Sequence, residues 1–151
     1  VISNKRDAKG LISAKRNKIN TKIYYFKEKS KDEKKILNIL IKDKIEIICL
    51  AGFMKILSKN FIKKFNGKII NIHPSLLPKY KGLNTHSRSL DNSDKYSGCT
   101  VHFVNSKLDS GKIILQKKVK ILQNDTSKTL QKRILKQEHK IYPEALRIIL
   151  N

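Results

Sequence analysis

Apolar and polar positions along the chain follow helical spacing in some segments and strand spacing in others. Between residues 32 and 43 the apolar residues fall on one face of a helix: Ile36, Leu37, Leu40 and Ile41. Residues 46–51 then form a nearly all-apolar run, which is typical of a central parallel strand covered on both faces. Helix followed by buried strand is the pattern of a βαβ sheet, so we predict an α/β fold.

The other apolar segments predict the remaining elements. A helix from Ala8 and a strand over residues 21–26 come first, and strands are expected over residues 69–73, 98–104 and 113–118. Because the last two are joined by a short turn, they should pair antiparallel. A long helix from Ser127 carries an apolar stripe, with a break or kink expected at Pro143: Leu130, Ile134, Ile141, Ala145 and Ile148. The prediction is a Rossmann-like, mostly parallel sheet flanked by helices, ending in an antiparallel strand pair.

Length and cysteine content restrict the class of protein. A chain of 151 residues suits a single domain spanning residues 1–151. No apolar run approaches the ~20 residues that span a bilayer, so no membrane association is expected. Cys49 and Cys99 lie far apart in apolar runs and show no metal-ligand spacing. We therefore expect no metal and a reducing, cytoplasmic compartment.

The net charge of +22 raises the alternative of a nucleic-acid-binding protein. The lysines are spread along the whole chain, however, and no aromatic-basic stacking motif accompanies them. We therefore expect small-molecule substrates and no specific nucleic-acid partner. The oligomeric state is left open by the sequence.

The candidate chemistry begins at the strand over residues 69–73. Asn71 and His73 are two residues apart, so in a strand they project from the same face, and Pro74 keeps His73 out of helical conformation. An amide and an imidazole aimed at one point can hold a carbonyl oxygen as it becomes an oxyanion, and the imidazole can move a proton. A buried strand-end histidine beside a structural asparagine is an equally good interpretation. Asp109, in a predicted loop between two strands, offers a carboxylate that could orient and charge the imidazole.

Six stretches carry a family resemblance in the same order along nearly the whole chain: residues 50–57, 71–80, 82–86, 98–104, 108–111 and 137–143. Together they resemble the folate-dependent phosphoribosylglycinamide formyltransferases. The Asn-x-His-x-Ser-Leu-Leu-Pro core is shared by several formyltransferases, including those acting on methionyl-transfer RNA. Residues 82–86 and 137–143 are what resemble the glycinamide enzyme.

The resemblance implies a formyltransferase fold and transfer of the formyl group of 10-formyltetrahydrofolate to the amino group of 5-phosphoribosylglycinamide, without a metal. It also implies that His73 is the catalytic acid, that Asn71 holds the formyl oxygen and that Asp109 sustains the imidazolium. His86 and His102 are expected to play structural or supporting roles.

The resemblance further assigns two binding regions. The folate pocket would consist of the catalytic Asn71 and Asp109 together with Lys31, Met54, Lys55, Ile56, Leu57, Asn105, Ser106, Lys107 and Leu108. The ribonucleotide would contact Leu135, Lys136, Gln137 and Glu138. Without the resemblance, a solvated helix carboxylate is the simpler interpretation of Glu138.

The sequence also departs from the family. The family begins with a strand and a Gly-x-Gly-Ser-Asn turn that binds the substrate phosphate at a helix start, and nothing like it occurs here. We therefore expect an N-terminally incomplete domain. Lys31 and Lys55 stand where arginine is expected, which removes a planar donor fork. The alternatives are an inactive, truncated homologue and another folate-dependent formyltransferase.

Overall fold

The chain forms two compact units, which are described separately. In the computed structural model, which describes all residues 1–151, one unit comprises Val1–Ile45 and Lys63–Phe65. The other comprises Glu46–Ile62 and Asn66–Asn151. None of the helices is long and apolar enough to cross a membrane.

The N-terminal unit contains four elements: β1 (Ile2–Ser3), α1 (Lys9–Arg16), β2 (Lys22–Ile23) and α2 (Lys29–Lys42). β1 and β2 pair in parallel over two residues each, so the strand expected over residues 21–26 is much shorter than predicted. Its buried apolar side chains are Leu11 and Ala14 from α1, Ile36 and Leu37 from α2, and Phe65. The helical stripe predicted between residues 32 and 43 is thus confirmed in part, since Ile41 is exposed.

The larger unit is built on a four-stranded sheet: β3 (Ile47–Leu50), β4 (Lys68–His73), β5 (Tyr96–Phe103) and β6 (Ile113–Lys120). The spatial order is β3-β4-β5-β6; β3 and β4 are parallel, whereas β4–β5 and β5–β6 are antiparallel. The α/β class and the antiparallel pair over the last two strands are confirmed. The antiparallel join of β4 to β5 makes this sheet mixed.

β3 differs from its prediction. Its apolar run favours a central strand, but β3 is an edge strand of the four-stranded sheet, its other residues are only partly buried and Cys49 is exposed. An apolar run indicates that the side chains favour burial, whereas the order of strands in a sheet depends on pairing between segments far apart in the sequence. The prediction of a strand covered on both faces is therefore wrong for this element.

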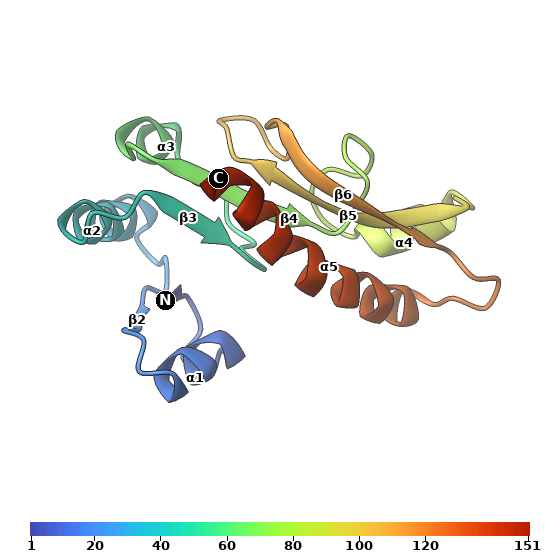
Figure 1. Cartoon of the computed structure of the whole chain (residues 1–151), viewed down its shortest axis with the longest axis horizontal. Helices are drawn as coiled ribbons and strands as arrows, with labels where there is room; N and C mark the ends of the chain where they lie inside the picture. The colour runs from blue at the N-terminus through green and yellow to red at the C-terminus, as the bar shows by residue number, and fades with distance from the viewer. The chain divides into compact units, whose positions relative to one another are not determined.

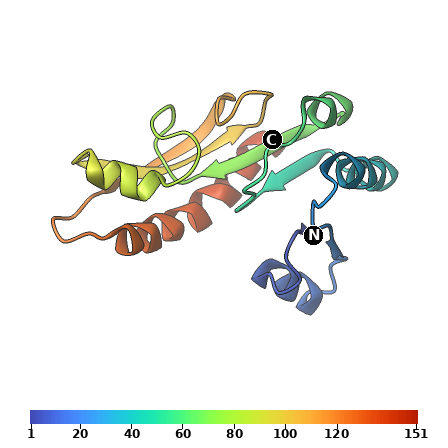
Figure 2. The ribbon, with the colours of Figure 1, turned by 180° about the vertical axis from the view of Figure 1, so that it is seen from behind.

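The core of the larger unit lies between the sheet and the helix α5 (Ser127–Leu150), which runs beside β4, β5 and β6 in both views (Figures 1 and 2). The core consists of apolar residues from β4, β5 and α5: Ile70, Cys99, Val101, Leu130, Ile134, Ile141 and Ala145. α5 begins with a capping box between Thr126 and Thr129, and it continues through Pro143 without the expected break. The predicted stripe includes Ile148, but this residue is 53% exposed and Ile149 packs on the core instead, so that member of the stripe is wrong.

β5 is buried on both faces. Cys99 and Val101 face the core, as their alternation predicts, but Thr100 and His102 on the other face are also at most 2% exposed. The Thr100 hydroxyl donates to the Ser75 carbonyl (2.6 Å) and accepts from the Leu77 amide (3.1 Å). The loop that follows β4 is therefore held against β5 by these hydrogen bonds.

Two short helices complete the chain: α3 (Lys59–Lys64) and α4 (Thr85–Asp91).

Candidate active site

The end of β4 delivers two polar side chains to one cavity, of about 690 Å³. Asn71 and His73 both line this cavity. Ile70, the residue before Asn71 in β4, is instead fully buried in the core. In the sheet, Asn71 pairs with His102 and His73 pairs with Thr100. The prediction that the amide and the imidazole project from the same face of the strand is confirmed.

Both ring nitrogens of His73 face hydrogen-bond acceptors. Nε2 donates to the Tyr80 carbonyl at 2.8 Å, and Nδ1 lies 3.4 Å from Oδ2 of Asp109. Two acceptors on the two nitrogens suit a ring that carries a proton on each of them. Since His73 is only 6% exposed, water does not compete strongly for these contacts.

Asp109 reaches the imidazole from the loop between β5 and β6. Its Oδ2 also accepts the amide N–H of Gly82 at 2.9 Å, and its side chain is 9% exposed. Asp109 itself has a positive φ of 43°, an uncommon backbone conformation for a residue with a side chain. Two loops, one after β4 and one after β5, therefore meet at this carboxylate.

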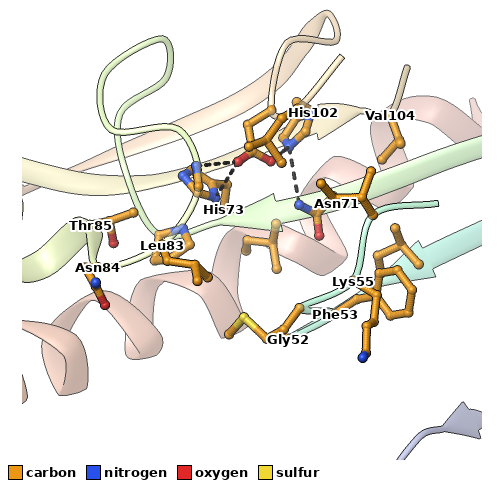
Figure 3. Close-up of a pocket in the computed structure, with 18 of the residues that line it drawn as sticks. Gly52, Phe53, Lys55, Asn71, His73, Leu83, Asn84, Thr85, His102 and Val104 are labelled. Carbon is orange, nitrogen blue, oxygen red and sulfur yellow. Dashed lines mark hydrogen bonds and ion pairs between the residues drawn. The ribbon is translucent and has the colours of Figure 1, made fainter. Parts of the chain in front are cut away.

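His102 orients Asn71. Nδ1 of His102 donates to the Phe103 carbonyl at 2.8 Å, so in the neutral ring Nε2 is an acceptor for the Asn71 amide nitrogen, 3.4 Å away (Figure 3). Burial lowers the pKa of His102, more than the Phe103 hydrogen bond and the Asp109 charge raise it. The ring is therefore neutral near pH 7, and its 3.7 Å approach to Asp109 is not an ion pair.

Two loops contribute both apolar and polar side chains to the cavity lining. They are residues 52–57, which follow β3, and residues 104–109, which follow β5. Several of their side chains project with large exposed fractions, among them Met54 at 78% and Ile56 at 60%. Such a surface, rich in backbone groups and apolar side chains, suits a flat ring system.

The cavity is also bounded by α5 and the start of α4. Leu135 and Glu138 lie on the side of α5 that faces the cavity, with Gln131 one turn before them. Burial raises the pKa of Glu138, against a smaller lowering effect of His139. His86 also lines the cavity; its Nδ1 is buried without a hydrogen-bond partner, and burial lowers the pKa of the ring.

Comparison with known proteins decides the family. The sequence matches the formyl transferase family over residues 1–146. The chain belongs to this family.

Two relatives illustrate the similarity of sequence. The phosphoribosylglycinamide formyltransferase of Haemophilus influenzae is 46% identical over 146 residues, which cover 95% of this chain and 69% of that protein. The trifunctional purine biosynthetic protein adenosine-3 of Homo sapiens is 45% identical over 152 residues, which cover 99% of this chain. The match spans only 15% of that longer relative.

Solved formyl transferase structures agree with the fold. The phosphoribosylglycinamide formyltransferase from Brucella melitensis superposes with a TM-score of 0.91 at 46% identity, covering 99% of this chain and 78% of that one. The glycinamide ribonucleotide transformylase 1 from Symbiobacterium toebii gives a TM-score of 0.93 at 38% identity, covering 99% and 72%. The predicted formyltransferase fold is confirmed.

Most of the site residues that the family resemblance implies line the cavity described above. They are Met54, Lys55, Ile56, Leu57, Asn71, His73, Asn105, Ser106, Lys107, Leu108, Asp109, Leu135 and Glu138. Lys136 and Gln137 do not line it, because four consecutive helical residues cannot share one face. Lys31 belongs to the N-terminal unit, where its exposed side chain pairs with Glu28 at 2.5 Å.

Two contributors to the site are missing from the sequence prediction. The Tyr80 carbonyl and the Gly82 amide are backbone groups, which every residue carries, so no residue type marks them. For the Gly82 amide, the only sequence signal was the glycine itself. Its φ of 79° is readily adopted by a residue that has no Cβ. No group of three or more His, Cys, Asp and Glu side chains is arranged to hold a metal ion.

Proposed function

We propose that this chain transfers the formyl group of 10-formyltetrahydrofolate to the amino group of 5-phosphoribosylglycinamide in purine synthesis. The observation that carries the proposal is the convergence of Asn71, His73 and Asp109 on one cavity, in a chain whose relatives are named for this reaction. We further propose that both compact units belong to one formyltransferase domain, since the family match runs through both.

The reaction needs charge stabilisation on one oxygen. The lone pair of the substrate amine forms a new bond to the formyl carbon, and the electron pair of the carbonyl moves onto its oxygen. The Asn71 amide and the protonated His73 ring are the donors for that oxygen, and removing a donor of this kind costs roughly 3–4 kcal/mol of barrier. The carboxylate of Asp109 stabilises the imidazolium that does this work.

Collapse of the intermediate completes the transfer. The oxygen lone pair restores the carbonyl while the bond from carbon to the folate nitrogen breaks. The proton lost by the attacking amine ends on that departing nitrogen, carried by His73 or by water. The products are the formylated amine and tetrahydrofolate, and neither an oxidant nor a metal enters the balance.

Two parts of the cavity lining suit the two substrates. The apolar side chains of residues 52–57 and 104–109 fit the folate ring, and Lys55 and Lys107 in the same loops carry charge complementary to folate carboxylates. Glu138 on α5 fits the sugar hydroxyls, beside Leu135. Contact of Lys31 with folate, and of Lys136 and Gln137 with the ribonucleotide, stays a prediction.

Partners and location follow from the same proposal. The cavity suits small-molecule substrates, and the expectation of no specific nucleic-acid partner, which rests on the dispersed lysines, stays a prediction. A cytoplasmic location stays a prediction, which rests on two cysteines that are both free thiols.

Formyl transfer by the purified chain tests the proposal. Incubation with 10-formyltetrahydrofolate carrying a ¹³C-formyl group and 5-phosphoribosylglycinamide should move the label to the glycinamide nitrogen. His73→Ala should slow this transfer by orders of magnitude. Tight folate binding with no labelled product would instead favour an inactive homologue, and binding of neither substrate would reject both.

A further inference from the structure

A cluster of polar and aromatic side chains surrounds Tyr80, outside the cavity. This Tyr80 cluster consists of Lys79, Tyr80, Arg88 and Asp94, and none of the four lines the cavity. Its members come from the loop after β4, from α4 and from the turn that follows α4. The reaction chemistry described above makes no use of these side chains.

Asp94 holds two consecutive residues of the loop. Its Oδ2 accepts from the Tyr80 hydroxyl at 2.8 Å, and its Oδ1 accepts from Nζ of Lys79 at 3.0 Å. The hydrogen bond from Lys79, followed by that from Tyr80, lowers the pKa of Asp94, so it stays a carboxylate at neutral pH. Charge-assisted hydrogen bonds of this kind are stronger than neutral ones.

Arg88 holds the same loop from α4. Its guanidinium lies 5.0 Å from the centroid of the Tyr80 ring, a cation–π distance. Nη1 of the same side chain donates to the Lys81 carbonyl at 2.7 Å and approaches the Leu83 carbonyl at 3.4 Å. The side chain of Tyr80 and the peptide that follows it are therefore fixed by one residue.

The conformation that these contacts hold is an uncommon one. Tyr80 has a φ of 54°, in the left-handed region that residues with a Cβ avoid. In that conformation its carbonyl accepts the hydrogen bond from Nε2 of His73 at 2.8 Å. The direction of the acceptor therefore depends on side chains that never touch His73.

We propose that Arg88 and Asp94 are positioning residues for His73, which act by holding the Tyr80 carbonyl against Nε2. This inference deepens the proposed function and rests on it for its catalytic meaning. With Nε2 occupied by Tyr80, the nitrogen that exchanges a proton with the substrate is Nδ1, which lies beside Asp109.

The two acceptors compete for the single proton of a neutral ring. Tyr80 favours the proton on Nε2 and Asp109 favours it on Nδ1, and the shorter contact is that to Tyr80. Loss of the Tyr80 cluster should therefore move the proton of the neutral ring toward Nδ1. His86 and His102 also lie close enough to His73 to interact with its charge, so the readout must be assigned to His73 alone.

The test is the tautomer of His73 in the full chain, read from long-range ¹H–¹⁵N correlations of ¹⁵N-histidine-labelled protein. With four histidines in the sequence, the signals can be assigned by substituting the other three one at a time. When the His73 ring is neutral, the unsubstituted chain should carry the ring proton on Nε2. Arg88→Gln and Asp94→Asn should shift the population toward Nδ1, and Arg88→Lys should restore part of the original state.

A milder variant keeps the test open if those changes disturb folding. Tyr80→Phe removes only the hydroxyl that donates to Asp94, and it should shift the tautomer of His73 in the same direction by a smaller amount. Tyr96→Phe makes the same atomic change at an exposed position and should leave the tautomer unchanged. Nδ1 protonation in the unsubstituted chain, or an unchanged tautomer in Arg88→Gln and Asp94→Asn, would overturn the inference.

Kinetics separate this inference from the proposed function. For Arg88→Gln, kcat should fall about tenfold while KM for both substrates changes less than about twofold. A chain that shows the tautomer shift but transfers no formyl group would contradict the proposed function alone. A chain that transfers formyl with an unshifted tautomer in the variants would contradict this inference alone.

Discussion

Oδ2 of Asp109 lies 3.4 Å from Nδ1 of His73 while it accepts the amide N–H of Gly82 at 2.9 Å. One carboxylate oxygen thus joins the loop after β5 to the loop after β4, at the imidazole that the proposed reaction uses. The position of the charge depends on backbone groups of both loops. Substitutions that displace either backbone should therefore affect activity without changing a polar side chain.

Gly111→Ala should displace the loop that carries Asp109. A Cβ at Gly111 would collide with the carbonyl of Phe103, which is backbone and cannot swing away. We expect a loss of about 1–3 kcal/mol in the free energy of unfolding, together with a fall in kcat. Urea denaturation and the transfer assay measure the two effects.

Gly10→Ala is the matched control. Gly10 lies in α1, and apart from its chain neighbours and the backbone of its own helix nothing lies within 4 Å of the added methyl group, so alanine should stabilise the helix by up to about 1 kcal/mol. Equal effects of the two substitutions would contradict the importance of the close approach at Gly111.

Thr100→Val should loosen the loop after β4. The Thr100 hydroxyl is fully buried and bonds the Ser75 carbonyl, the Leu77 amide and the Gln116 amide group. Valine has nearly the same shape but leaves buried backbone groups unsatisfied, which costs about 1–3 kcal/mol. Thermal unfolding checks the loss, with Thr21→Val as the same change at a partly exposed position; similar losses at both would reject the explanation.

Glu138→Gln should increase stability and weaken ribonucleotide binding. Burial raises the pKa of Glu138 above its ordinary value of 4.5, so the folded state holds the proton more tightly than the unfolded state does. Stability is therefore lost as the pH rises from about 4.5 through the raised pKa, and the amide avoids this loss.

Urea midpoints at about pH 4 and pH 7 test the effect of Glu138. The variant should exceed the parent only at the higher pH, while Glu144→Gln on the same helix should show no such difference. A Glu138 variant that is less stable than the parent at pH 7 would show that the charged carboxylate is favourable in the folded chain.

Acid should destabilise the fold through the buried His102 and the partly buried His86. Burial lowers the pKa of His86 and of His102 below the ordinary 6.5, so the unfolded state binds protons more readily there. The free energy of unfolding should therefore fall as the pH drops below about 6.5. Melting temperatures measured between about pH 7.5 and pH 5 should fall less for His86→Gln than for the parent, and an equal fall would contradict this origin.

The sequence could predict what depends on local periodicity. Asn71 and His73 share a face because strand side chains alternate, whatever the strand's neighbours are. The core residues of α5 follow helical spacing for the same reason, up to its last turns. Asp109 was recognisable only as a loop carboxylate that could reach the imidazole; its role beside His73 came from the family resemblance, because nothing local brings residues of two loops together.

The sequence could not predict what depends on distant pairing. The alternation along β5 predicts that His102 lies on a polar face, yet it is only 2% exposed and lies beside Asn71 of β4 and Asp109 of the loop after β5. The position of β3 at the edge of its sheet is likewise set by strand order. The Tyr80 carbonyl needs a left-handed tyrosine, held by Arg88 and Asp94, which no propensity of tyrosine indicates.

A double-mutant cycle on formyl transfer tests most directly whether His73 and Asp109 act as one unit. The parent chain, His73→Ala, Asp109→Asn and the double variant are compared by kcat/KM. If the carboxylate acts through the imidazole, the double variant should be little slower than His73→Ala alone, because Asp109 has nothing left to stabilise. Losses that multiply in the double variant would mean that the two residues act independently, which contradicts the shared site.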